Sequence, residues 1–316
     1  MLIDAAHSHL QEISVDKIDQ NPENPRLFFR QEELDSLLDS IRQYGVQVPI
    51  TVYKHRNRYT LIDGERRWRC SIKLNKRTVP ALIVEKPDGL TNLLLMFNIH
   101  ALREQWDLLT IANKLPRIID LLEERDGRLP TESALSQYTG LSRGVIRRCR
   151  LLMELPDEYK QELLTELAKP KPEQKLSEDF FIEMERALKT VERAMPTVVG
   201  DKDRVRRVLI DKYKVGVIKN LVDLRDIAKI ARAENVECNP DDAEQTLRRL
   251  FKKNRYSIKQ AFDDSVSEAY SERDVLTRIN ALLSRLEEFE AGELDEDLQE
   301  ALNALQDAVK RLLEGE

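Results

Sequence analysis

The feature that most constrains this chain is the arginine-rich turn Gly64-Glu65-Arg66-Arg67-Trp68-Arg69, which follows a strand-like run at residues 59–63. Glycine at the end of a strand permits a sharp turn, and the arginines then open a helix. Such a cluster would be a poor core, so the turn should face something polyanionic. Phosphates bind at helix starts, and arginine adds bidentate contacts. A solvated basic helix start is the alternative reading of an isolated Arg-Arg pair.

Length and charge limit the classes of protein that the chain can belong to. Its 316 residues suggest two or three domains. Charged residues make up 34% and aromatic residues 6%, which suits a helical and strongly solvated protein. Because the formal net charge is −6, contact with nucleic acid must come from local basic patches.

The cysteines argue against both a disulfide framework and a zinc site. Cys70, Cys149 and Cys238 show neither CxxC spacing nor paired histidines, as expected in a reducing compartment. No signal peptide and no apolar run long enough to span a membrane is present. We therefore expect a soluble cytoplasmic protein without membrane partners.

The N-terminal third mixes strand and helix signals. Short apolar runs predict strands, and apolar residues at helical spacing predict two helices, the first ending at Gly45. Together they predict a small α+β module. Beyond residue 90 the strand signals disappear, and a long helical stretch over 91–125 is expected, interrupted near Pro116. The predicted strands cover residues 13–15, 49–53, 59–62 and 79–84, and the two helices lie around 34–41 and 66–74.

Residues 131–152 have the layout of a helix-turn-helix. Thr131 or Ser133 can cap a first helix, Gly140 permits the turn, and Ser142 can cap a second helix. An ordinary helical hairpin with a charged face would share this layout. We favour DNA contact because arginines cluster on the helix that such a motif sends into the major groove. These arginines are Arg143, Arg147, Arg148 and Arg150.

The chain beyond the linker at residues 169–178 is predicted to be entirely helical. A second basic cluster, residues 248–255, is either a solvated face or a contact to a nucleic-acid backbone. Two further segments, 275–289 and 298–312, repeat apolar residues at spacings of three and four, as partner helices require. A hairpin could bury one seam against the other or against the protein body. Two hairpins that pair as a four-helix bundle would bury far more, so we expect a homodimer with residues 272–314 in its interface.

Several motifs in one order resemble the ParB family of DNA-segregation proteins. The likeness extends over about the first 165 residues and includes the GERRxR box at 64–69 and the first nucleotide motif at 45–50. The other matching segments are Asn24-Pro25-Arg26, the segment from Asn98 to Arg103, Ser142-Arg143, and residues 150–156.

This resemblance implies an α+β N-terminal ParB/sulfiredoxin-like domain, followed by an all-α helix-turn-helix domain and an all-α C-terminal region. The expected domains are residues 1–100, which bind nucleotide; 101–168, which bind DNA; the linker 169–178; a helical domain at 179–265; and a helical hairpin at 266–316. It also implies a dimeric clamp on double-stranded DNA that is switched by a nucleoside triphosphate, usually CTP with Mg²⁺.

The resemblance further assigns roles to individual residues. It implies that the phosphates lie against the turn at residue 64, that the base or sugar lies near Gln47 and Pro49, and that Asn98 lies near the metal. Glu65 is the candidate catalytic residue of a slow CTPase. The nucleotide residues are Gln47, Pro49, Gly64, Glu65, Arg66, Arg67, Asn98 and Arg103, and the DNA residues are Ser142, Arg143, Arg147 and Arg148.

Three departures from the family pattern leave alternatives open. Phe97 replaces a common glutamate, the stretch that engages a ParA-type ATPase is lacking, and the C-terminal half differs from the usual dimer domain. One alternative is a metal-dependent nuclease or phosphohydrolase acting on DNA or nucleotide. Another is a transcriptional regulator with a vestigial nucleotide pocket. The metal ligands of the nuclease would be Asp63, Glu65, Asn98 and His100.

Overall fold

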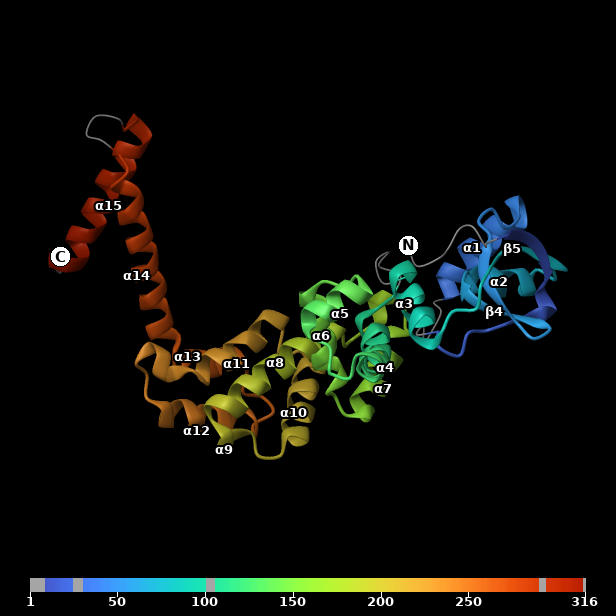
Figure 1. Cartoon of the computed structure of the whole chain (residues 1–316). Coiled ribbons are helices and arrows are strands. Elements are labelled where there is room, and N and C mark those ends of the chain that lie inside the picture. The colour runs from blue at the N-terminus through green and yellow to red at the C-terminus, as the bar shows by residue number, and fades with distance from the viewer. Residues whose placement is uncertain (1–8, 25–30, 101–105, 290–293, 315–316) are drawn as a thin grey trace. The chain divides into compact units, whose positions relative to one another are not determined.

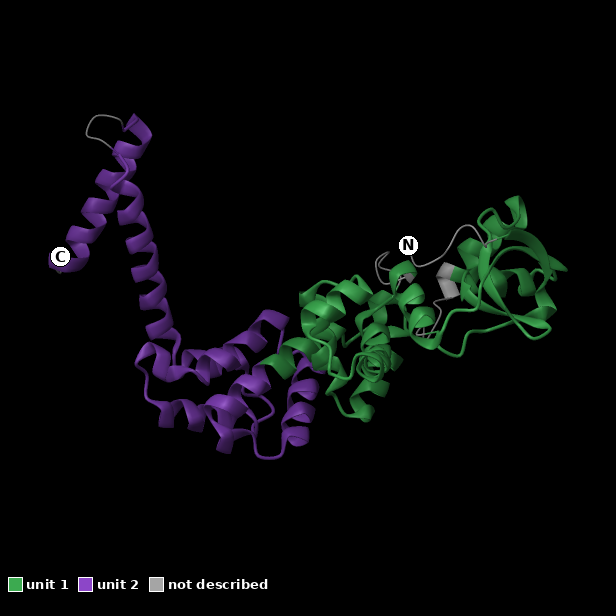
Figure 2. Cartoon of the chain, in the orientation of Figure 1, with its two compact units in different colours: residues 1–186 green, residues 187–316 purple. Residues whose placement is uncertain are grey.

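The chain divides into two compact units, residues 1–186 and residues 187–316 (Figure 2). Helix α8 (Glu178–Ala194) runs across the boundary between them. The finer domain boundaries expected from the sequence stay predictions. The computed structural model describes residues 9–24, 31–100, 106–289 and 294–314.

A five-stranded mixed sheet forms the N-terminal part of unit 1, with strand order β1-β5-β3-β4-β2 (Figure 1). The pairs β1–β5 and β3–β4 are antiparallel, and the pairs β3–β5 and β2–β4 are parallel. Three of the predicted strands are confirmed, the first is found at residues 9–14 instead of 13–15, and the short β2 is an addition. The strands are β1 (His9–Ser14), β2 (Ile18–Asp19), β3 (Ile50–His55), β4 (Arg58–Asp63) and β5 (Thr78–Val84).

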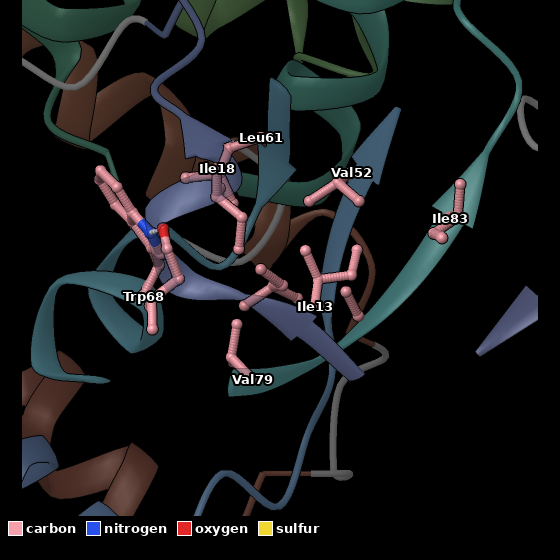
Figure 3. Close-up of a cluster of buried hydrophobic side chains, with 10 residues drawn as sticks. Ile13, Ile18, Val52, Leu61, Trp68, Val79 and Ile83 are labelled. Carbon is pink, nitrogen blue, oxygen red and sulfur yellow. Dashed lines mark hydrogen bonds between the residues drawn. The ribbon is translucent and has the colours of Figure 1, made fainter. Parts of the chain in front are cut away.

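The core of this domain lies between the sheet and helix α2 (Glu65–Lys73) (Figure 3). Trp68 of α2 packs among strand residues such as Val52 and Val79, and its indole Nε1 donates to the Val15 carbonyl at 3.3 Å. A second cluster joins α2 to α1 (Gln31–Tyr44). Its member Cys70 is buried, and burial raises the pKa of its thiol.

Helices make up the rest of unit 1 in its described residues, and helix α4 (Leu108–Asp126) is not interrupted near Pro116 as the sequence predicted. Pro116 lies inside the continuous helix α4, which buries Leu115 and Ile118 on either side, so packing outweighs the hydrogen bond that proline removes. Helix α4 begins after Asp107, whose carboxylate accepts the Thr110 N–H at 2.8 Å and caps the helix. The helices are α3 (Gly89–His100), α4 (Leu108–Asp126), α5 (Glu132–Thr139), α6 (Arg143–Met153) and α7 (Asp157–Leu167), followed by the 3₁₀ turn η3 (Lys171–Glu173).

Unit 2 is all helical in its described residues, as expected. It ends in two long helices, α14 (Ser267–Leu286) and α15 (Glu296–Glu314), neither of which buries a side chain. No helix in the described part of the chain is both long and apolar enough to cross a bilayer. The shorter helices are α9 (Pro196–Val199), α10 (Lys202–Lys214), α11 (Leu224–Ile230), α12 (Pro240–Leu250) and α13 (Ile258–Asp263), with 3₁₀ turns η4 (Leu221–Asp223) and η5 (Ala233–Val236).

Candidate functional site

Gly64 places the start of α2 at the end of β4, and no other residue fits there. Its φ is +95°, and an added Cβ would lie 2.6 Å from Cγ2 of Ile50. As the N-cap of α2, Gly64 offers no side chain to the first N–H groups of the helix. The N-cap side chain therefore gives no cap to the positive end of the helix dipole, and helix starts of this kind bind anions. Glu65, Arg66 and Arg67 follow directly and are partly buried.

Arg67 connects this turn to the loop before β3. One of its guanidinium nitrogens, Nη1, donates to the carbonyls of Val48 and Pro49, both at 2.6 Å. The other, Nη2, pairs with the Asp63 carboxylate at 2.8 Å. The structure thus brings Pro49 beside the turn, while Gln47 is exposed on the same loop. Arg67, predicted as a phosphate ligand, holds three protein oxygens.

Glu65 connects the same turn to the segment before α1. Its Oε1 accepts from Arg69 at 2.7 Å, and its Oε2 accepts from the side-chain amide of Asn24. Asn24 begins the predicted Asn-Pro-Arg turn, whose Arg26 lies outside the described residues. A carboxylate that is held by a guanidinium and an amide is better suited to positioning than to abstracting a proton.

A buried amide pair supports the site and was not predicted. Nδ2 of Asn21 donates to the Leu61 carbonyl of β4 at 2.8 Å and to Oδ1 of Asn92 in α3 at 3.0 Å. These bonds fix the segment before Asn24 against β4 and α3. The polar Asn92 within the apolar run of α3 was the available signal in the sequence.

The third motif contributes less to the described site. Nδ2 of Asn98 donates to the Leu94 carbonyl at 2.8 Å, which leaves its Oδ1 as the oxygen for a metal. Phe97 is buried and packs edge-on against Trp106, with ring centroids 5.3 Å apart, so it supplies no ligand. Arg103 and the side chain of His100 lie outside the described residues.

The proposed nuclease metal site finds no cluster of ligands to support it. Asp63 is paired with Arg67, and Glu65 is paired with Arg69. Within the described ranges, no three His, Cys, Asp or Glu side chains gather closely enough to hold a metal. A magnesium ion at Asn98 would therefore need oxygens from a bound nucleotide.

The helix-turn-helix predicted from the sequence is formed by α5 and α6. Oγ1 of Thr131 accepts the Ala134 N–H at 3.2 Å and caps α5, while Oγ of Ser142 accepts the Val145 N–H at 3.3 Å and caps α6. Gly140 makes the turn between them with φ +73°. Each helix therefore starts and ends where its local chemistry indicates.

The arginines of α6 gather around one carboxylate that the sequence did not indicate. Glu132, the first residue of α5, lies 3.0 Å from Arg147 and 3.7 Å from both Arg143 and Arg150. Side-chain exposure is 60% for Arg143 and 61% for Arg147, so both remain available to solvent and ligand. One carboxylate cannot neutralise three guanidinium groups, and this face of α6 keeps excess positive charge.

The remaining predicted DNA residue, Arg148, points to α8. Its guanidinium pairs with Asp179, the neighbour of the partly buried Glu178. Oε1 of Glu178 accepts the Leu109 N–H at 2.6 Å, which joins α8 to α4. Burial raises the pKa of Glu178 to about 7, while the hydrogen bond from Leu109 favours the charged form. Arg148 thus contributes to the packing of α6 within unit 1.

Comparison with known proteins identifies the N-terminal domain. Residues 3–98 match the family model described as ParB N-terminal domain. The chain is 30% identical over 164 residues to the nucleoid occlusion protein of Bacillus pumilus, covering 51% of this chain and 54% of that one. It is 28% identical over 164 residues to the chromosome-partitioning protein ParB of Caulobacter vibrioides, covering 49% and 50%.

One solved structure is also similar in sequence to part of this chain. The C-terminally truncated ParB of Caulobacter crescentus, complexed with CTP-γ-S, is 29% identical, with a TM-score of 0.29, over 52% of this chain and 90% of that chain. The chain spans about half the length of the curated relatives it matches. The ParB resemblance of the sequence is thereby confirmed.

Proposed function

Because residues 3–98 belong to the ParB N-terminal domain family, we propose that the chain is a DNA-binding protein switched by a nucleoside triphosphate. CTP, taken with Mg²⁺, is the nucleotide that the ParB resemblance implies. The observation that carries the proposal is the glycine-capped start of α2. There Gly64 provides no side-chain cap, and Arg67 and Glu65 connect the helix to two other motif segments.

The contacts of Arg67 suggest how a nucleotide could act. A triphosphate at the start of α2 would compete with the Val48 and Pro49 carbonyls and with Asp63 for this guanidinium. Exchange of partners would release the loop that carries Gln47. Binding would then be coupled to a movement of the segment between α1 and β3. Magnesium would neutralise phosphate charge, with Oδ1 of Asn98 as its protein ligand.

The excess positive charge of α6 supports a DNA contact through Arg143 and Arg147. Both side chains are exposed, and Ser142 fixes the helix start beside them. A ParB-type clamp requires two copies of the chain, bound to double-stranded DNA on a nucleoid or a plasmid in the cytoplasm. Segregation and regulation of a mobile element are the two processes that such a switch would serve.

Isothermal titration with CTP, ATP, GTP and UTP plus Mg²⁺ tests the switch. Arg67→Ala should weaken binding by about 1.5–3 kcal/mol, as for a lost charged hydrogen bond. Arg58→Ala is the matched control, because Arg58 pairs with Asp19 at the opposite end of β4. Absence of binding to all four nucleotides, with and without DNA, would leave a regulator with a vestigial pocket.

Selection of a target from random duplexes tests the recognition helix. The triple variant Arg143→Ala, Arg147→Ala and Arg148→Ala should lose preference for the selected site. Its salt slope should fall by about one unit for each phosphate contact that is removed. Unchanged affinity of the triple variant would show that α6 does not read DNA.

A further inference from the structure

A pocket lies in unit 2, where helix α9, the start of α10 and the end of α12 meet (Figure 1). Helices α9 and α12 lie side by side there. The volume of the pocket is about 190 Å³. An apolar cavity of roughly 150 Å³ holds one benzene molecule, so this pocket has room for one ring or one branched aliphatic chain.

The floor of the pocket is apolar and fixed. Four side chains form it, and each of them is at most 6% exposed. Contact with such a floor favours the hydrocarbon part of a ligand and leaves a purely hydrophilic anion without a partner there. The four residues are Val198 and Val199 of α9, Val205 of α10, and Phe251, which follows α12.

Two cations form the rim of the pocket. Arg204 and Lys252 line it and are exposed to solvent. In the described part of the chain, neither side chain has a carboxylate within the 4.0 Å of an ion pair. An anion bound above the floor would therefore not compete with a protein carboxylate for either of them.

The other charged groups around the pocket take part in the fold. Nη2 of Arg248 donates to Glu244 at 2.6 Å and to the Thr197 carbonyl at 2.9 Å. Asp201 is the N-cap of α10, and its carboxylate accepts the Arg204 N–H at 3.1 Å. Three cations, the two of the rim and Arg248, thus face two carboxylates, and the pocket keeps an excess of one positive charge.

The floor and the charge together define the ligand. One excess positive charge matches a monoanion, and a carboxylate is a monoanion whose two oxygens fit a guanidinium fork. The apolar floor requires a hydrocarbon body on that carboxylate, and the volume limits this body to one ring or one branched chain. The backbone of a DNA duplex, whose charge lies on phosphates spaced along a helix, would leave the floor uncovered.

We infer that the pocket is a binding site for a small monocarboxylate that carries one aromatic ring or one branched aliphatic chain. The hydrocarbon body lies on the apolar floor, and the carboxylate binds Arg204 and Lys252. These residues are separate from those of the proposed nucleotide and DNA sites. Because the bound ligand contacts α9, α10 and the end of α12 together, it would stabilise unit 2.

Isothermal titration of the full-length chain with three compounds tests both parts of the site. Hydrocinnamate should bind with a Kd on the order of 0.1 mM, within the range that ligand efficiency allows for a molecule of its size. Hydrocinnamyl alcohol, which keeps the ring and lacks the charge, should bind at least about 10-fold more weakly. Acetate, which keeps the charge and lacks the ring, should not bind below about 10 mM.

Two matched variants separate the rim from net charge. Arg204→Gln with Lys252→Gln should weaken the binding of hydrocinnamate about 10-fold and remove its advantage over the alcohol. Lys253→Gln with Arg255→Gln removes two exposed cations of the same turn that do not line the pocket, and its affinity for hydrocinnamate should equal that of the parent. Both variants change only exposed side chains, so both should unfold at the Tm of the parent.

Fluorescence anisotropy with a DNA duplex that the parent binds shows which ligand the rim serves. The Arg204→Gln, Lys252→Gln variant should bind the duplex as tightly as the Lys253→Gln, Arg255→Gln variant does. A larger loss of duplex affinity than of hydrocinnamate affinity would assign the rim to DNA and overturn the inference. So would equal losses of hydrocinnamate affinity in the two variants, tighter binding of inorganic phosphate, or no binding of hydrocinnamate. The titrations contain neither nucleotide nor DNA, so their outcome does not depend on the proposed function.

Discussion

Lys212 is a charged side chain held in the interior of unit 2. It is 1% exposed, and burial lowers the pKa of its ammonium group to about 8 from 10.5. Between these two values the unfolded chain binds more protons than the folded chain, so the contribution of Lys212 to stability rises with pH. Two backbone carbonyls depend on its donors in either charge state.

Urea unfolding of the parent and of Lys212→Met, at pH 7.5 and at pH 10.5, measures this effect. The difference in unfolding free energy between parent and variant should grow by about 3 kcal/mol in favour of the parent over that interval. Lys219→Met, at an exposed lysine, should show no such growth. An unchanged Lys212→Met difference would mean that the ammonium titrates as it does in water.

The turn at Gly64 requires glycine for two reasons, its positive φ and the lack of space beside Ile50, and variants can separate the two. Gly64 and Gly45 both have positive φ, +95° and +74°, but only at Gly64 would a Cβ meet a neighbour, Cγ2 of Ile50. Gly45→Ala should cost about 1 kcal/mol for its backbone conformation. Gly64→Ala should cost about 1–3 kcal/mol more from overpacking. Equal Tm shifts in circular dichroism would contradict this account of the strand-to-helix turn.

The ion pairs between α5 and α6 oppose DNA binding. Glu132 attracts Arg143, Arg147 and Arg150, and phosphates must compete with it. An exposed ion pair contributes up to about 1 kcal/mol, so Glu132→Gln should raise affinity for duplex DNA by up to about fivefold. Glu124→Gln, at an exposed glutamate of α4, should have no effect in the same anisotropy titration. Weaker binding of Glu132→Gln would indicate that Glu132 orients the arginines for DNA.

Local chemistry explains which elements the sequence could predict. The strands, the positive φ of Gly64 and the caps Thr131 and Ser142 depend on residues within a few positions of one another. The bonds of Asn21 to Leu61 and Asn92 span 40 and 71 positions, so the polar Asn92 in the apolar run of α3 could indicate a buried amide but not its partners. Pro116 shows the same limit, because packing on both sides of it sustains α4.

The sequence predicted which residues form the candidate site but not which atoms those residues contact. Glu65 contacts Asn24 and Arg67 contacts Pro49, so three of the matched segments lie together. Arg67 binds the Val48 and Pro49 carbonyls because the tertiary fold places the loop before β3 next to α2. The sequence alone therefore identified the charged side chains but not the protein oxygens that they bind.

At the scale of the whole molecule, apolar side chains along the two C-terminal segments, residues 275–289 and 298–312, are exposed to solvent. Val275 is 53% exposed, Phe289 47% and Val309 42%, although apolar residues repeat along both helices. A second copy of the hairpin would bury these stripes, so the chain should be a homodimer. Light scattering should give twice the chain mass for the intact protein and one chain mass after truncation following Tyr270. A dimer that survives truncation, or an intact monomer, removes the proposal.

The three cysteines differ in exposure, so the order in which they are labelled reports local unfolding. Cys149 lies in α6 with its thiol 3.8 Å from the Leu108 carbonyl, and burial raises its pKa to about 12. Cys70 is buried between α1 and α2, whereas Cys238 is partly accessible. A maleimide at neutral pH will label Cys238 first, and Cys149 only when α6 separates from α4. The labelling rates of Cys70 and Cys149 therefore measure how often the parts of unit 1 around them unfold locally, with and without DNA or nucleotide.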